Sequence, residues 1–260
     1  MRALLAMPAY NEAQYLPSVL AGVRQHIDDV FVVDDGSTDE TPEILRSTPG
    51  IATIRHETNL GYGKSLIDAF DCAVRGAYDW ALTMDCDEQH APEHIPEFLA
   101  AAAQDDADII SGSRYLQVMD NDDVPPKTRR AINMAVTALL NCQLDLGLTD
   151  AFCGFKAYRV SGLEKLHVTD PGYAMPLQVW VQAARAGLRV RELPIKLIYN
   201  DPNRHFGGVL DDPHARLAHY ASVLRDEMGG FTCTCFDGDD KPMACEKIAS
   251  QCARCYADPP

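Results

Sequence analysis

Residues 80–89 read WALTMDCDEQ, and the mainly apolar run in this stretch passes directly into Asp85-Cys86-Asp87. Such a run is typical of a strand that is buried on both faces. The carboxylates of Asp85 and Asp87 and the amide of Gln89 offer hard oxygen ligands, which Mg2+ and Mn2+ prefer. The stretch therefore predicts a buried strand that carries a divalent-metal site at its carboxyl end.

Strand-like and helix-like segments alternate on both sides of this stretch. The expected strands are residues 4–7, 30–33, 51–54, 80–84 and 108–111. Apolar residues at helical spacing predict helices between them and from about 129 to 140, and a further helix and strand are expected within 171–195. This alternation predicts an α/β fold with a mainly parallel sheet flanked by helices. Such sheets bind ligands beyond the carboxyl ends of their strands.

The composition narrows the possible ligands. The chain has 260 residues, with Lys+Arg 23 against Asp+Glu 38 and a formal net charge of -15. That charge excludes a protein that coats nucleic-acid phosphates without regard to sequence, and any anionic ligand must meet a local group of cations or a metal. No run approaches the roughly 20 apolar residues of a membrane span, and Met1-Arg2 leads into a strand and not a secretory signal. We expect a cytoplasmic protein.

Gly61-Tyr62-Gly63-Lys64-Ser65 looks like a phosphate-binding loop, but its spacing does not fit one. A P-loop would need glycine where Thr58 stands, and the dinucleotide motif would need its third glycine where Leu66 stands. Two interpretations stay open. The segment is either a flexible turn that leads into a helix, or a loop that brings Lys64 to the ligand.

Six ordered blocks over about residues 2–208 together resemble glycosyltransferase family 2, and within it the dolichyl-phosphate mannose synthase branch. The blocks are PAYNE (8–12), VDDGSTD (33–39), NLGYGK (59–64), DCDEQH (85–90), GSRY (112–115) and CGFKAYR (153–159). The resemblance implies a GT-A fold, which has a Rossmann-like sheet, with a nucleotide-sugar pocket.

The resemblance also implies roles for individual residues. Pro8, Tyr10 and Glu12 would line the nucleoside, and Val33 and Asp35 would contact its base or ribose. Asp85, the backbone of Cys86, Asp87 and Gln89 would hold the metal and the diphosphate, while Arg114 and either Arg129 or Arg130 would bind phosphate groups.

The expected activity is that of a metal-dependent, inverting hexosyltransferase. Its donor would be a GDP- or UDP-hexose and its acceptor most simply a polyprenyl phosphate, met at a membrane surface or through a membrane partner subunit. Asp87 and Arg114 would act on the leaving diphosphate, and an anionic acceptor needs no general base. For a hydroxyl acceptor, Asp150 is the candidate base by position. The alternatives are a nucleotide-sugar-binding protein without turnover and a sugar-phosphate nucleotidylyltransferase.

Two departures from the branch concern the acceptor. Gln178 stands where the mannose synthases carry Glu, and the segment around Arg204 lacks their Ser-Lys-Leu continuation. Arg204 remains a candidate phosphate ligand in a glycine-rich loop, 202–210, that could contact the acceptor.

The last part of the chain changes in composition, which places a boundary between a catalytic domain, 1–228, and a small cysteine-rich appendage, 229–260. Four of its five cysteines could hold a structural Zn2+, with disulfides or a disordered tail as the alternatives. These cysteines are Cys233, Cys235, Cys245, Cys252 and Cys255.

Overall fold

The structure is a computed structural model that describes residues 1–200 and 208–229. Within these residues, seven strands form one sheet in the order β3-β2-β1-β4-β6-β5-β7. Arg204 and the five cysteines of the expected appendage lie outside the described residues, so their predicted roles remain predictions.

The sheet is mixed but mainly parallel. Only β6 runs antiparallel to its neighbours, β4 and β5, among the pairs of this sheet. The strands are β1 (Ala3–Ala9), β2 (Val30–Asp34), β3 (Ala52–Arg55), β4 (Trp80–Thr83), β5 (Ile109–Ser113), β6 (Lys156–Arg159) and β7 (Val190–Pro194). Sequence analysis did not predict β6, because charged residues at both of its ends hide the apolar pattern of a strand. Pairing with β4 and β5 decides its conformation instead.

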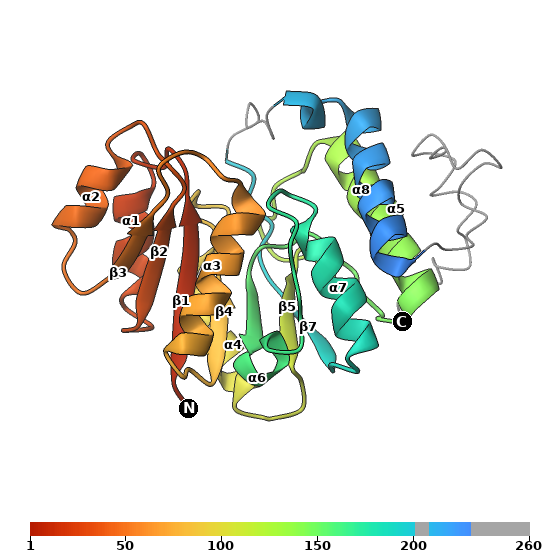
Figure 1. The fold of residues 1–260 in the computed structure, drawn as a ribbon, viewed down its shortest axis with the longest axis horizontal. Helices are drawn as coiled ribbons and strands as arrows, with labels where there is room; N and C mark the ends of the chain where they lie inside the picture. The colour runs from red at the N-terminus through yellow and green to blue at the C-terminus, as the bar shows by residue number, and fades with distance from the viewer. Residues whose placement is uncertain (201–207, 230–260) are drawn as a thin grey trace.

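Helices cover both faces of the sheet, which gives three layers (Figure 1). The helices are α1 (Leu16–Val23), α2 (Thr41–Ser47), α3 (Tyr62–Arg75), η1 (Pro92–His94), α4 (Ile95–Ala102), α5 (Lys127–Leu144), α6 (Val160–Leu163), α7 (Met175–Arg185), η2 (Gly208–Asp211) and α8 (Pro213–Met228). Side chains alternate along β1, where Leu4 and Ala6 join one buried cluster and Leu5 and Met7 join the other. The first cluster packs under α3, α5, α6, α7 and α8, and the second under α1, α2 and α4.

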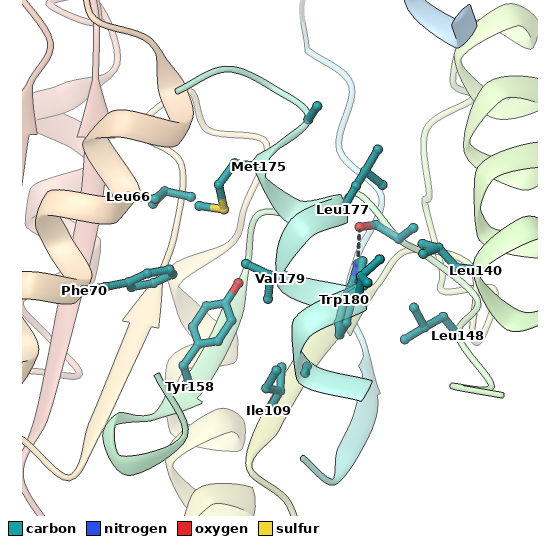
Figure 2. Packing of buried hydrophobic residues seen from close by; sticks show 14 of the residues in the cluster. Leu66, Phe70, Ile109, Leu140, Leu148, Tyr158, Met175, Leu177, Val179 and Trp180 are labelled. Atoms are coloured by element: carbon teal, nitrogen blue, oxygen red, sulfur yellow. Dashed lines mark hydrogen bonds between the residues drawn. The ribbon is translucent and has the colours of Figure 1, made fainter. Parts of the chain in front are cut away.

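Figure 2 shows the first cluster around α7. Trp180 is fully buried, and its Nε1 donates a hydrogen bond to the carbonyl of Ala151 at 2.9 Å. The rings of Phe70 and Tyr158 form a T-shaped pair with centroids 4.9 Å apart. These contacts fix the loop that precedes β6, which carries Asp150 and Gly154 toward the carboxyl edge of the sheet.

Helix α8 was not predicted, although its start carries recognisable signals. The side chain of Asp212 caps the helix by accepting from Ala215 N at 2.8 Å, and Pro213 occupies the first turn. The helix ends at Gly229, whose φ is +70°. It packs against α5 and α7 (Figure 1), and its Leu217, Tyr220 and Leu224 belong to the first cluster.

Candidate active site

The turns that follow β1 and β2 hold each other in place. Asn11 has a φ of +56°, and its side-chain oxygen accepts the backbone N–H of Thr38 at 2.8 Å. In return, Ser37 Oγ accepts Asn11 N at 3.0 Å, and an oxygen of Asp39 accepts Ala13 N at 3.0 Å. Two of the predicted motif blocks therefore form one rigid rim at the carboxyl edge of the sheet.

Glycines in the neighbouring loop serve close backbone packing. A Cβ at Gly36, whose φ is +74°, would lie 2.4 Å from the carbonyl carbon of Thr58, and one at Gly61 would lie 2.3 Å from the carbonyl oxygen of Pro171. Asp35 accepts the N–H groups of Leu60 and Gly61, each at 2.8 Å. The loop is thus a turn that leads into α3, as in the first interpretation from sequence, but it is tightly packed and not flexible as that interpretation had it.

A cavity of about 580 Å3 opens at the carboxyl ends of β1, β2 and β4, and we call it the strand-end cavity. Its lining residues are Pro8, Ala9, Tyr10, Glu12, Asp35, Asn59, Gly61, Tyr62, Ser65, Asp85, Cys86, Asp87, Gln89, Arg129 and Tyr173. The structure thereby brings together most of the residues that sequence analysis linked to a nucleotide sugar. Lys64 is not among them, because it forms an ion pair with Asp68 on the same helix.

Val33 is placed differently from the expectation. It is fully buried in the hydrophobic cluster under α3, and it does not line the strand-end cavity. The side chain of Cys86 is also buried in a core cluster, although the residue lines the cavity, as expected for a contact made by its backbone.

The loop after β4 is shaped by its own hydrogen bonds. Gln89 N donates to Asp87 Oδ1 at 3.0 Å across Glu88, which has a φ of +59°. The backbone N–H of Asp85 donates to Nδ1 of His90 at 3.1 Å. Burial lowers the pKa of His90, so its neutral ring accepts this bond. A residue in the left-handed region beside two carboxylates is the kind of strain that binding sites retain.

Asp85, Asp87 and Gln89 fit a divalent metal that also binds a diphosphate. Among the described residues, no group of three or more His, Cys, Asp and Glu side chains could hold a metal ion by itself. Mg2+ and Mn2+ commonly use one or two carboxylates and take their other ligands from phosphates and water. The buried amide nitrogen of Gln89 has no hydrogen-bond partner among the described residues, so it can donate to an oxygen of a diphosphate but cannot ligate the metal itself.

Gly154 leaves the space that Asp85 occupies. A Cβ at this position would lie 2.6 Å from Asp85 Oδ2 and 2.9 Å from the hydroxyl oxygen of Tyr62. Burial raises the pKa of Tyr62 well above its usual value, so its hydroxyl stays protonated and donates to Asp85 Oδ1 at 3.2 Å. Gly154 and Tyr62 together orient one of the two carboxylates.

A second cavity of about 190 Å3, which we call the arginine cavity, adjoins the first and shares Tyr62, Asp85, Gln89, Arg129 and Tyr173 with it. Its other lining residues are Arg114, Tyr115, Pro125, Ile132, Asn133, Phe152, Pro176, Leu197, Tyr199, Arg216 and Tyr220. Three arginines and one carboxylate line it, so it is locally cationic in an acidic protein and suits an anionic ligand.

Arg114 is held by a buried carboxylate. Its Nε donates to Asp150 Oδ2 at 2.7 Å and its Nη2 to Asp150 Oδ1 at 3.0 Å. Asp150 also accepts from Asn133 Nδ2 at 2.7 Å. Burial raises the pKa of Asp150, but the charge of Arg114 and these hydrogen bonds outweigh it and hold that pKa well below its usual value.

This arrangement does not place Asp150 where a base could act. The side chain is 0% exposed and lines neither cavity, and a carboxylate with so many donors has little affinity for a proton. Its contacts instead orient Arg114 toward the arginine cavity.

The structure distinguishes the two arginines at the start of α5. Arg129 lines both cavities, and its guanidinium lies 5.4 Å from the ring centre of Tyr199. Arg130 stacks on Tyr115 at 3.5 Å and lines neither cavity. Arg129 is therefore the better candidate of the pair for a phosphate.

Sequence analysis missed several residues of the site. Arg216 and Tyr220 come from the unexpected helix α8, and Arg216 is only 4% exposed. Burial raises the pKa of Tyr220 to about 12, so its hydroxyl is protonated at neutral pH. The aromatic rings of Tyr62 and Tyr173 stack at 5.5 Å between the cavities. Tyr62 stood within a quoted motif. The start signals of α8 indicate a helix, but they do not place Arg216 and Tyr220 at a cavity.

Gln178 contributes to packing and not to either cavity. Its side-chain oxygen accepts Asp170 N at 2.7 Å, and its Nε2 donates to Glu227 on α8 at 2.9 Å. A glutamate could not donate this second bond. Gln178 in place of Glu therefore removes no side chain from either cavity. It does not favour the alternative of a nucleotide-sugar-binding protein without turnover.

No helix within residues 1–200 and 208–229 combines the length and apolar character needed to cross a membrane.

Comparison with known proteins matches the chain to a family. The model described as glycosyl transferase family 2 matches residues 5–167, which is more than half of the chain. The chain belongs to glycosyltransferase family 2. It is 30% identical over 240 residues to the undecaprenyl-phosphate mannosyltransferase of Micrococcus luteus, a match that covers 87% of this chain and 97% of that protein. It is 31% identical over 204 residues to the polyprenol monophosphomannose synthase of Mycolicibacterium smegmatis, which covers 75% and 76%.

These relatives place this family 2 glycosyltransferase in the dolichyl-phosphate mannose synthase-like branch. Among solved structures, the chain is similar to glucosyl-3-phosphoglycerate synthase from Mycobacterium tuberculosis in complex with Mn2+, UDP-glucose and phosphoglyceric acid. The TM-score is 0.66 at 20% identity, covering 89% of this chain and 81% of that one. At this identity the likeness shows a GT-A-like fold and nothing about the substrate.

Proposed function

We propose that this glycosyltransferase moves a hexose, with inversion, from a GDP- or UDP-hexose bound in the strand-end cavity to a polyprenyl phosphate bound in the arginine cavity. The observation that carries the proposal is the junction of the two cavities at Asp85, Gln89 and Arg129. The names of the two mannosyltransferase relatives support a polyprenyl phosphate acceptor, and the Mn2+ and UDP-glucose of the structural neighbour support a metal-bound donor.

The donor half of the site would bind and orient the nucleoside diphosphate. Asp85, Asp87 and Gln89 would hold Mg2+ or Mn2+, which neutralises charge on the diphosphate leaving group. Asp35 and Glu12 line the strand-end cavity and not the arginine cavity, and they would accept hydrogen bonds from the nucleoside. Tyr62 would keep the Asp85 carboxylate in its orientation through the hydrogen bond at 3.2 Å.

The acceptor half would bind a phosphate by positive charge. Arg114 and Arg129 line the arginine cavity, and Arg216 adds a third guanidinium from α8. Fixed cations in a water-poor cavity stabilise both the acceptor anion and the charge that develops on the leaving group. The phosphate oxygen is already anionic, so the reaction needs no general base. This agrees with a cavity in which Asp85, a metal-site residue, is the one carboxylate among the described lining residues.

A loop at the rim of the arginine cavity offers a surface for the bilayer that carries such an acceptor. Tyr115 and Pro125 line the cavity, and between them Val118 is 89% exposed and Val124 is 87% exposed. Asp122 accepts Leu197 N at 2.8 Å, which ties the loop to the segment after β7. Exposed apolar side chains beside the mouth would enter the interface of a membrane, where the protein would act peripherally.

An acceptor panel tests this proposal. The protein with Mn2+ and labelled GDP- and UDP-hexoses is offered a short-chain polyprenyl phosphate, the corresponding polyprenol and phosphoglyceric acid. We expect a labelled polyprenyl-phosphate hexose and no transfer to the other two. Transfer to phosphoglyceric acid or to the free alcohol alone would refute the acceptor assignment.

A further inference from the structure

A buried histidine links Asp35 to helix α3. His56 follows β3, and its side chain is 8% exposed. Its Nδ1 lies 2.6 Å from Asp35 Oδ1, and its Nε2 lies 2.9 Å from Asp68 Oδ2 on α3. Lys64, one turn earlier on the helix, forms an ion pair with Asp68. A charge chain, by which we mean the ionisable side chains of Asp35, His56, Asp68 and Lys64 in contact one after another, therefore links the strand-end cavity to α3.

Each ring nitrogen of His56 lies within hydrogen-bond distance of a carboxylate oxygen. A neutral imidazole carries one N–H and would turn a lone pair toward one of them, whereas the cation donates from both ring nitrogens. Asp35 in turn has three hydrogen-bond partners, His56, Leu60 N and Gly61 N. A carboxylate has about four acceptor positions. Asp35 is thus fixed in orientation with roughly one position left for a ligand in the cavity that it lines.

We infer that His56 is a positioning residue for the donor nucleoside: with Asp68 and Lys64 it fixes the Asp35 carboxylate so that the remaining oxygen position accepts an N–H or O–H of that nucleoside. The inference rests on the proposed function for the identity of the ligand. Asp35 lines the strand-end cavity and not the arginine cavity, so it acts away from the bond that reacts. Contacts of that kind bind ground state and transition state equally, and they affect KM more than kcat.

The test compares His56→Gln and Asp68→Asn with Asp71→Asn. Asp71 is a matched control on α3, because it is exposed and pairs with Arg75 outside the charge chain. A glutamine cannot donate to two carboxylates on opposite sides, and Asp68→Asn removes the anion that holds the far side of the ring. We expect both variants to raise donor KM about tenfold with kcat within twofold of wild type, and Asp71→Asn to change neither.

Calorimetry with UDP, GDP and pyrophosphate, each with Mn2+, separates the inference from the proposed function. If wild-type protein bound pyrophosphate but neither UDP nor GDP, the proposal of a nucleotide-sugar donor would be wrong. If wild type binds UDP or GDP, His56→Gln should weaken that nucleotide about tenfold and leave pyrophosphate unchanged. A folded His56→Gln that binds the nucleotide as wild type does, or that loses pyrophosphate equally, would overturn the positioning role. A lowered melting temperature of His56→Gln with unchanged donor KM would mean that the charge chain contributes only to stability.

Discussion

Replacement of Gly154 by alanine is a selective way to disturb the metal site. The new Cβ would stand 2.6 Å from Asp85 Oδ2 and 2.9 Å from the Tyr62 hydroxyl, whereas ordinary contacts begin near about 3.4 Å. Both atoms are the far ends of side chains, so they can move by about 1 Å without displacing backbone. The substitution therefore acts on the orientation of the carboxylate and little on the fold.

The expected loss of metal-dependent binding follows from that displacement of the Asp85 carboxylate. Changes in the residues that orient metal ligands typically cost 10- to 100-fold in metal affinity or activity, so we expect about this loss in Mn2+-dependent nucleotide binding for Gly154→Ala. Stability should change by no more than about 1 kcal/mol, or roughly 2–4 °C in Tm for a protein of this size. Calorimetric titration of the nucleoside diphosphate with Mn2+, together with thermal unfolding, measures both quantities.

Gly162→Ala is the control, because its Cβ would meet nothing closer than Leu188 at 3.5 Å. It should bind nucleotide and Mn2+ as wild type does. Wild-type affinity in Gly154→Ala, with the fold intact, would refute the account of how Asp85 is oriented. A loss of many degrees in Tm would show that the residue acts through packing.

Three further predictions concern the arginine cavity and its rim. Arg114→Lys should cut transfer at least tenfold and also lower Tm, because an ammonium cannot reproduce the two-pronged contact of the guanidinium with buried Asp150, and full activity would make Arg114 dispensable. Asp150→Asn should destabilise the protein by about 3–5 kcal/mol at neutral pH by leaving a buried charge unpaired. Folding lowers the pKa of Asp150, so its contribution to the free energy of unfolding is present above about pH 4 and is lost as the pH falls below that value. Chemical denaturation should therefore show a smaller difference in that free energy between variant and wild type at pH 3 than at pH 7. The double variant Val118→Ser/Val124→Ser should slow transfer to a long-chain acceptor in vesicles about tenfold and leave transfer to a short-chain acceptor in solution unchanged. The control Ile54→Ser, at an exposed position on β3, should leave both rates unchanged. An equal effect of the double variant on both acceptors would place the loop's role in the cavity and not at the membrane.

The sequence predicted the sheet because the alternation of apolar strands and amphipathic helices is local information. It also predicted that Asp85, Asp87 and Gln89 would stand at a strand end, since the acidic cluster follows an apolar run directly. The face on which Val33 lies was not predictable, because β2 is buried on both faces and the pattern does not distinguish them.

Contacts between distant segments account for the rest. Arg114 and Asp150 are 36 residues apart and meet through the packing of β5 against the loop before β6, so the sequence offered Asp150 as a base and not as a partner. Arg216 reaches the arginine cavity only because α8 folds back on α5 and α7. The partner of Lys64 was local, at i+4, but its link to Asp35 through His56 needed the tertiary structure.

The central claim is that the strand-end cavity holds a nucleotide-sugar donor through a metal at Asp85, Asp87 and Gln89. Calorimetric titration of a GDP- or UDP-hexose into wild-type protein and Asp87→Ala, in Mn2+ and in excess chelator, tests it most directly. The account predicts binding by wild type in Mn2+, at least tenfold weaker binding in chelator, and no further effect of chelator on Asp87→Ala, which should unfold at the wild-type temperature. Equal donor affinity of wild type in Mn2+ and in chelator would contradict the claim.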